Sequence, residues 1–146
     1  MTLESALNAV CDALRTRVTQ LPVVIGRPDA QAERALCVWP WRMSESAAGR
    51  QPFLPMTARG AVYQASVAPL TVQFFLMASP ALDSVGLQAL DAGRRALIDN
   101  PVLDQGRLQI VSETLSMEEL AGIFLSAHLP LGLCAPFLLR GIVEAT

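Results

Sequence analysis

The side chains that could do covalent chemistry are few and widely spaced. The chain of 146 residues has one histidine, His128, and three cysteines, Cys11, Cys37 and Cys134. A nucleophilic site needs a base beside the nucleophile, but His128 follows a short predicted helix, so we expect it at the surface or at a helix end. A lone histidine and cysteines outside any C-x-x-C pair do not form a zinc site.

The carboxylates show no catalytic pairing either. Glu118 and Glu119 are adjacent, and neighbouring residues on a helix do not face one another. Four aspartates fall at expected turns and helix ends, where this residue is ordinary: Asp29, Asp83, Asp99 and Asp104. The sequence has no G-x-S-x-G, P-loop or G-x-G-x-x-G motif. It therefore predicts no enzyme, cofactor or metal, although carboxylates that meet only in space leave a small enzyme or ligand-binding domain as an alternative.

The composition points instead to contacts with other proteins. Hydrophobic residues make up 52% of the chain, charged residues only 16%, and the mean hydropathy is +0.39. A chain of this length suits a single domain, here 1–146, that folds without disulfides. Apolar patches on such a domain usually mark interfaces. We expect self-association, and the alternative is a tightly packed monomer.

The charges exclude other classes of partner. The net charge is −2, and all eleven basic residues are arginine, which suits interfaces but also follows from GC-rich codon usage. Nothing resembles the basic stripe of a nucleic-acid-binding protein, a membrane span of about 18 apolar residues or an export signal. An odd, widely spaced set of cysteines fits a reducing cytoplasm. We predict a cytoplasmic protein that contacts neither nucleic acid nor membrane.

The first half of the chain predicts one helix, two strands and a long loop. Apolar residues at helical spacing predict a helix at 3–20, capped by Thr2 and ended by Pro22. Strands are predicted at 23–25 and at 35–41, where Pro40 must lie at an end, an edge or a bulge.

A long flexible loop is predicted at 43–60, because this segment lacks periodicity and holds several glycines and prolines. Compact domains rarely keep such a loop unless it has a role. Arg42, Arg50 and Arg59 flank or belong to it, and Phe53 has no element to bury it. We expect Arg50 and Arg59 to pair with acidic groups of a partner, and the alternative is a solvated loop without a role.

The second half alternates strands and helices. A strand at 70–78 places Phe75 on its outward side, so both faces are expected to be covered near its end. A helix capped by Asp83 or Ser84 stops at Asn100. Then come a strand at 108–115, a helix at 116–124 opened by a capping box, and a long strand at 129–143. This order predicts an α+β fold, a mostly antiparallel sheet with helices packed on one face.

Three segments carry a family resemblance. The second predicted helix ends in DNPVL at 99–103, and LSMEEL at 115–120 leads to Phe124. The last strand alternates bulky and small residues: Leu131, Leu133, Cys134, Phe137, Arg140 and Ile142. Together these resemble the N-terminal domain of the cap, or tail-terminator, proteins of contractile injection systems, which are phage-tail-like machines of tube and sheath. Asn100 stands where the family often has histidine, and Pro136 interrupts the last strand.

The resemblance implies a structural cap that forms a hexameric ring on the terminal tube and sheath subunits and stops polymerisation. The protein would then be assembled from the cytoplasm into a phage-tail-like particle. A monomeric assembly factor that leaves the finished particle is an alternative. The residues predicted to lie at protein interfaces are Arg42, Arg50, Phe53, Arg59, Phe75 and Arg140.

Overall fold

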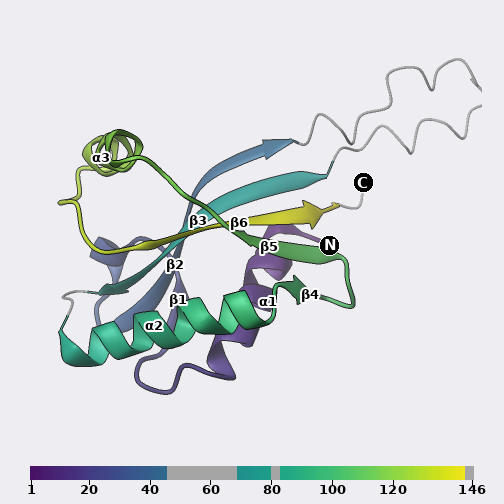
Figure 1. The fold of residues 1–146 in the computed structure, drawn as a ribbon, viewed down its shortest axis with the longest axis horizontal. Coiled ribbons are helices and arrows are strands. Elements are labelled where there is room, and N and C mark those ends of the chain that lie inside the picture. The colour runs from purple at the N-terminus through teal and green to yellow at the C-terminus, as the bar shows by residue number, and fades with distance from the viewer. Residues whose placement is uncertain (46–68, 80–82, 144–146) are drawn as a thin grey trace, which may run out of the picture.

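A mixed six-stranded sheet forms the centre of the part of the chain that the computed structural model describes, residues 1–45, 69–79 and 83–143 (Figure 1). The strands, in chain order, are β1 (Val23–Ile25), β2 (Ala35–Glu45), β3 (Leu70–Ser79), β4 (Val102–Leu103), β5 (Leu108–Ser112) and β6 (Ala135–Ile142). The helices are α1 (Leu3–Arg15), α2 (Ser84–Asp99), α3 (Met117–Ser126) and a 3₁₀ turn, η1 (Pro28–Ala30). The strand order is β1-β2-β3-β6-β5-β4, and only β1 and β2 pair in parallel. The predicted α+β fold with a mostly antiparallel sheet is confirmed.

Both faces of the sheet are covered, because β3 alternates two sets of apolar residues. Val72, Phe74 and Leu76 belong to the main core beneath α1 and α2. Phe75 and Met77 point the other way, into a smaller cluster beneath α3. The expected covering of both faces near the end of β3 is confirmed. The one-face arrangement of helices holds for α1 and α2, whereas α3 lies on the opposite face (Figure 1).

Helix α1 begins where the sequence predicts and ends earlier. The Ser5 amide donates to the Thr2 hydroxyl at 3.0 Å, which caps the helix. The Thr16 hydroxyl bonds the Ala13 carbonyl at 2.7 Å, and the helix ends there rather than at residue 20. A threonine side chain that bonds a nearby carbonyl competes with the helical pattern. Val18 nevertheless stays buried in the same core.

Helix α2 packs closely on the sheet through Gly93. Gly93 falls on the apolar side of the predicted helix, where a glycine suggests close backbone packing, and a Cβ there would lie 3.0 Å from a Leu36 methyl group, which confirms it. Asp83 caps the helix, accepting a hydrogen bond from the Gly86 amide at 2.9 Å. The helical spacing of apolar residues in 86–99 predicts that Leu87 and Ile98 are buried, and this prediction is wrong, because they are 49% and 47% exposed.

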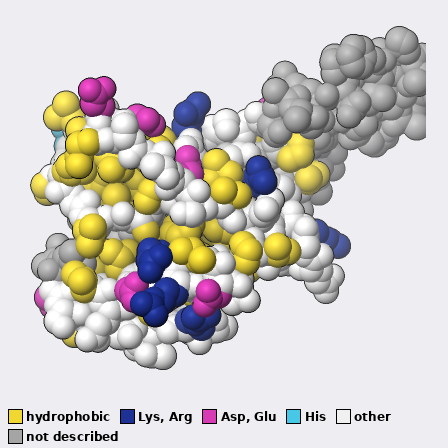
Figure 2. All heavy atoms as spheres, viewed as in Figure 1, with side chains coloured by type: hydrophobic (Ala, Val, Ile, Leu, Met, Phe, Trp, Pro, Cys, Tyr) yellow, Lys and Arg dark blue, Asp and Glu magenta, His cyan; other side chains and the backbone are white. Residues whose placement is uncertain are grey.

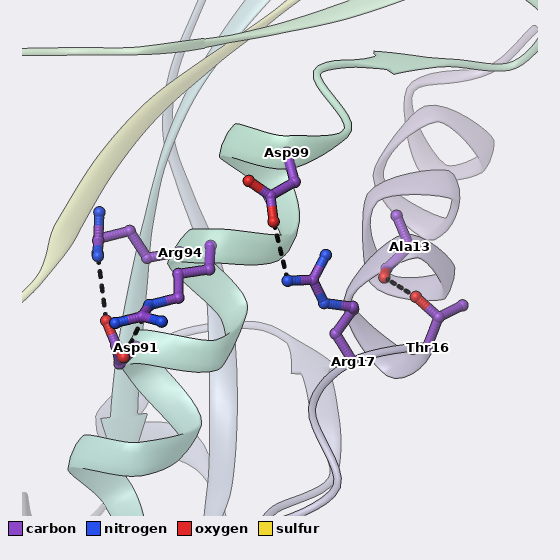
Figure 3. A network of polar contacts seen from close by, with 7 residues as sticks. Ala13, Thr16, Arg17, Asp91, Arg94 and Asp99 are labelled. Carbon is purple, nitrogen blue, oxygen red and sulfur yellow. Dashed lines mark hydrogen bonds and ion pairs between the residues drawn. The ribbon is translucent and has the colours of Figure 1, made fainter.

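An ion pair ties α2 to the end of α1. Arg17, just beyond α1, donates to Asp99 at the end of α2 at 2.9 Å (Figure 3). Both side chains are substantially exposed to solvent, and such pairs contribute little to stability. The contact therefore adds little to the stability of the packing between α1 and α2.

The predicted loop at 43–60 begins later than expected, because residues 43–45 belong to β2. A bulge separates Pro40 from Arg42. Pro40 also lies beyond Val38, the last residue of β2 that pairs with β1. Its missing N–H therefore removes no hydrogen bond between β1 and β2. Residues 46–60, and the segment 61–67 that follows, lie outside the described residues.

The last strand is shorter than predicted, and its irregularity lies elsewhere. It begins at Ala135, whereas residues 129–134 are not strand. The Pro136 carbonyl accepts from the Glu113 amide at 3.0 Å, just past the end of β5, so its missing N–H faces no strand. The register shifts at Gly141 instead, which has a φ of 97°.

Candidate protein-interaction surfaces

Among the described residues, the side chains that could take part in covalent chemistry are not arranged as a reactive site. Burial raises the pKa of the thiols of Cys11, Cys37 and Cys134 to about 11, so all three stay protonated near neutral pH and are poor nucleophiles. His128 is exposed just after α3, as predicted for a helix-end histidine. Within the described ranges, no three histidine, cysteine or acidic side chains gather as a metal site.

Two of the predicted interface residues share one face of the sheet. Arg42 is paired across strands with Gln73, and Arg140 is paired with Thr71. Paired residues lie on the same face, and Gln73 and Thr71 alternate with the inward residues of β3. Both arginines are exposed, and they project on either side of β3 from the face opposite α1 and α2.

We call this region the outer sheet face, and it comprises Arg42, Thr71, Gln73, Leu138 and Arg140. The amide of Gln73 donates to both carboxylate oxygens of Glu113, at 3.0 and 2.9 Å. Arg140 donates to the Gln109 side chain at 3.0 Å. Guanidinium groups pair with carboxylates through paired, charge-assisted hydrogen bonds. The outer sheet face therefore presents two exposed guanidinium groups, with the Glu113 carboxylate beside Gln73.

Phe75 cannot serve as an interface residue in this structure. Its side chain is fully buried, with ring centroids 5.6 Å from Trp39, 5.7 Å from Trp41 and 5.7 Å from Phe124. The prediction failed because α3 folds back over the outward side of β3. Phe75 instead anchors α3 to the sheet. Arg50, Phe53 and Arg59 lie outside the described residues.

A groove of about 730 Å³ lies between the middle of β2 and α3, and the sequence did not predict it. Its lining includes Arg27, Trp39, Trp41 and Glu118. The Arg27 guanidinium pairs with Asp29 at 2.9 Å, lies 5.9 Å above the Trp39 ring, and lowers the pKa of the Asp29 carboxyl through that hydrogen bond. The Trp41 indole nitrogen is buried with no acceptor among the described residues. The alternation W-P-W at 39–41 was the only available signal.

Two further exposed apolar groups were missed by the sequence reasoning. Met117 and Leu125 lie on the outward side of α3, and Leu87 lies on the outward side of α2. A helix in which apolar residues outnumber polar ones is a recognisable signal, and the polar side chains of α3, MEELAGIFLS, are Glu118, Glu119 and Ser126. For Leu87 the periodicity suggested burial, and only the packing of α2 shows otherwise.

Comparison with known proteins identifies the fold. No protein-family model matches the chain, and no curated protein does. A search of solved structures finds the tube-terminating cap of the anti-feeding prophage, with a TM-score of 0.74 and 18% identity, over 100% of this chain and 56% of that one. The chain has the fold of a tail-terminator cap. The resemblance seen in the sequence is thereby confirmed at the level of fold.

A second tail-terminator structure agrees. The sheath/tube terminator of an extracellular contractile injection system, PVC, in its extended state, matches with a TM-score of 0.72 and 14% identity. That match covers 100% of this chain and 58% of the terminator. The chain thus spans slightly more than half the length of each of these caps. In the described ranges, no helix has the length and apolarity needed to cross a membrane.

Proposed function

We propose that this protein is a structural terminator of a contractile injection system, a cap that ends the tube and sheath of a phage-tail-like particle. One observation carries the proposal: the whole chain shares its fold with two caps that are described as terminating a tube or a tube and sheath. The fold alone does not fix a function. The absence of a catalytic arrangement among the described side chains and the exposed arginines of the outer sheet face support the same reading.

In this proposal the cap is a ring of six copies, because the resemblance implies a sixfold tube and a closed ring matches that symmetry. It contacts the terminal tube and sheath subunits and acts without catalysis. The ring assembles in the cytoplasm from single copies and stays on the finished particle. Strand edges and exposed apolar residues are the surfaces that such assembly uses.

The test is to delete the gene in the organism that makes the particle and to measure tube lengths by electron microscopy. We expect tubes without the cap to be longer and more variable in length, and a plasmid copy of the gene to restore the wild-type distribution. Unchanged lengths after deletion would contradict a terminator.

Retention on purified particles separates the cap from the alternatives. A cap remains in each particle in a fixed ratio to the terminal ring, whereas a monomeric assembly factor is absent from finished particles. A small enzyme would be neither retained nor needed for length control. Quantitative mass spectrometry of purified particles distinguishes these cases.

A further inference from the structure

Helix α3 presents an apolar stripe to solvent in addition to the side that it buries. Phe124 is buried against the sheet, with Leu120 and Ile123 packed beside it. On the outward side, Met117 and Leu125 are 67% and 77% exposed. These two residues lie eight positions apart, about 80° around the helix, and they share one flank of it with the exposed Ala121 midway between them. Glu118, Glu119 and Ser126 also lie on its exposed surface, and the exposed apolar side chains mark the outward side of α3 as a candidate contact.

A trough with matching apolar residues runs along α2. It has a volume of about 580 Å³, and we call it the α2 trough. Its lining residues are Ser84, Leu87, Gln88, Leu90, Asp91, Arg94, Leu133, Cys134 and Ala135. Leu87 and Leu133 at its rims are 49% and 57% exposed. Figure 2 shows hydrophobic side chains gathered between α2 and the strands above it, with basic and acidic side chains interspersed along α2.

The α2 trough is open because the sheet ends early on this side. Strand β5 pairs only with residues 137–140 of β6, so no residue of β5 lies beside residues 133–135. Helix α2 lies beneath, and its outward residues face this gap. An apolar surface that the described part of the chain leaves uncovered is typical of a protein interface.

Charge decides which surfaces can meet. Arg94 and Arg95 both pair with Asp91, each at 3.1 Å (Figure 3 shows Arg94), which leaves the side of α2 with one excess positive charge. The stripe on α3 lies beside two acidic residues, Glu118 and Glu119. Contact between two α3 helices would bring like charges together, whereas α3 against the α2 trough brings opposite charges together.

We propose that the outward side of α3 in one copy of this chain occupies the α2 trough of a second copy. Leu125 and Met117 cover Leu87 and Leu133, and Glu118 lies beside Arg94. The two surfaces differ, so the contact is head-to-tail and generates a ring or an open chain rather than a closed pair. The inference deepens the proposed function by naming the surfaces that join neighbouring cap subunits.

Two single substitutions test the contact in the purified protein. Leu125→Asp alters only α3, and Leu87→Asp alters only the α2 trough; both side chains are exposed, so the fold should be unaffected. Met43→Asp is the matched control, since Met43 is 56% exposed and does not line the trough. Thermal unfolding of each variant verifies folding, and sedimentation velocity with NMR titration to about 1 mM, a range that detects millimolar association, measures assembly.

The wild type and Met43→Asp should associate, and each trough or α3 variant alone should remain monomeric. An equimolar mixture of Leu125→Asp and Leu87→Asp should form a dimer and nothing larger, because the pair retains one intact α3 and one intact trough. A wild type that is monomeric at 1 mM, or a mixture that stays monomeric, overturns the proposal. In that event the two surfaces are available to tube or sheath subunits instead.

Charge reversal provides a second measurement. Glu118→Arg and Arg94→Glu should each weaken association by about tenfold, and the double variant should recover most of it, as coupled charge pairs do across interfaces. Arg107→Glu, an exposed residue between β4 and β5, controls for the change in net charge. Equal effects from all three single reversals, without recovery in the double variant, contradict the pairing.

The outcomes separate this inference from the proposed function. If gene deletion changes tube lengths but the purified protein fails the mixing test, the protein is a terminator that uses other surfaces between its copies. If the mixing test succeeds and tube lengths are unaffected by deletion, the contact stands and the terminator role does not.

Discussion

At the scale of single residues, the backbone geometry at Gly141 requires a glycine. Its φ of 97° lies in the region that glycine adopts freely. A Cβ there would also collide with the carbonyl oxygen of Arg107. The bulge in β6 therefore depends on this glycine, and it aligns β6 with β3 beyond Arg140.

We predict that Gly141→Ala destabilises the protein by about 1–3 kcal/mol, the usual cost of a strained backbone position. Gly106→Ala is the matched control, because Gly106 has a φ of 90° but its Cβ would meet no atom within 4 Å. It reports the backbone strain alone. Urea denaturation measures both variants, and equal losses would show that the collision with Arg107 is relieved by a small shift.

The cap of α2 predicts a dependence on pH. The hydrogen bond from the Gly86 amide, followed by the charge of Arg34, lowers the pKa of the Asp83 carboxyl from its ordinary value of 3.8. The folded-state pKa therefore lies below the unfolded one, so the ionised carboxylate stabilises the fold at pH values above 3.8. That contribution is lost as the pH falls through the folded-state pKa.

Asp83→Asn keeps an acceptor for the Gly86 amide but cannot ionise. We expect the wild type to exceed this variant in urea midpoint at neutral pH, and the difference to disappear in acid. Arg34→Gln should retain part of the pH dependence, because the hydrogen bond from the Gly86 amide is a larger cause of the lowered Asp83 pKa than Arg34 is. A difference that persists unchanged below pH 3.8 would contradict the assignment to Asp83.

At the scale of elements, the features of each helix that depend on nearby side chains could be predicted from the sequence. The caps at Thr2, Asp83 and Ser116 and the buried face of α1 follow from side chains near them in the chain. The early end of α1 follows from the local bond of the Thr16 hydroxyl, whereas the exposure of Leu87 depends on where α2 meets the sheet. For the same reason α3 was located correctly but placed on the wrong face.

The attachment of α3 yields an element-scale prediction. Phe124 is buried and meets Trp39 edge-on at 5.7 Å and Phe75 at 5.7 Å. Phe124→Ala removes the centre of this separate cluster and should cost about 3–5 kcal/mol. Hydrogen exchange should quicken in α3 and remain slow in α1 and α2, which pack in the other core. Its neighbour, Leu125→Ala, should change stability by less than about 0.5 kcal/mol, and faster exchange throughout the molecule would contradict an independent cluster.

At the scale of the whole molecule, the interaction surfaces were the least predictable part. Arg42 and Arg140 are nearly 100 residues apart by their numbers in the chain, and only the pairing of β2 and β6 with β3 brings them to one face. Phe75 was predicted to lie at an interface, whereas the element that covers it is α3, from a distant segment of the same chain. The order of motifs, by contrast, was sufficient to indicate the terminator fold that the structural comparisons support.

The outer sheet face and the contact between copies are separate surfaces, so they can be disrupted separately. We predict that Arg42→Glu combined with Arg140→Glu leaves folding and self-association intact, because neither residue lines the α2 trough or belongs to α3. On particles, the double variant should lose length control, since reversed charges repel the acidic groups expected on the terminal tube or sheath subunit. Arg107→Glu, with half the change in charge and a position in the β4–β5 turn, should terminate tubes normally. If the double variant terminates tubes as well as the wild type does, the protein must contact the particle through another surface. The groove between β2 and α3 is then the next surface to alter.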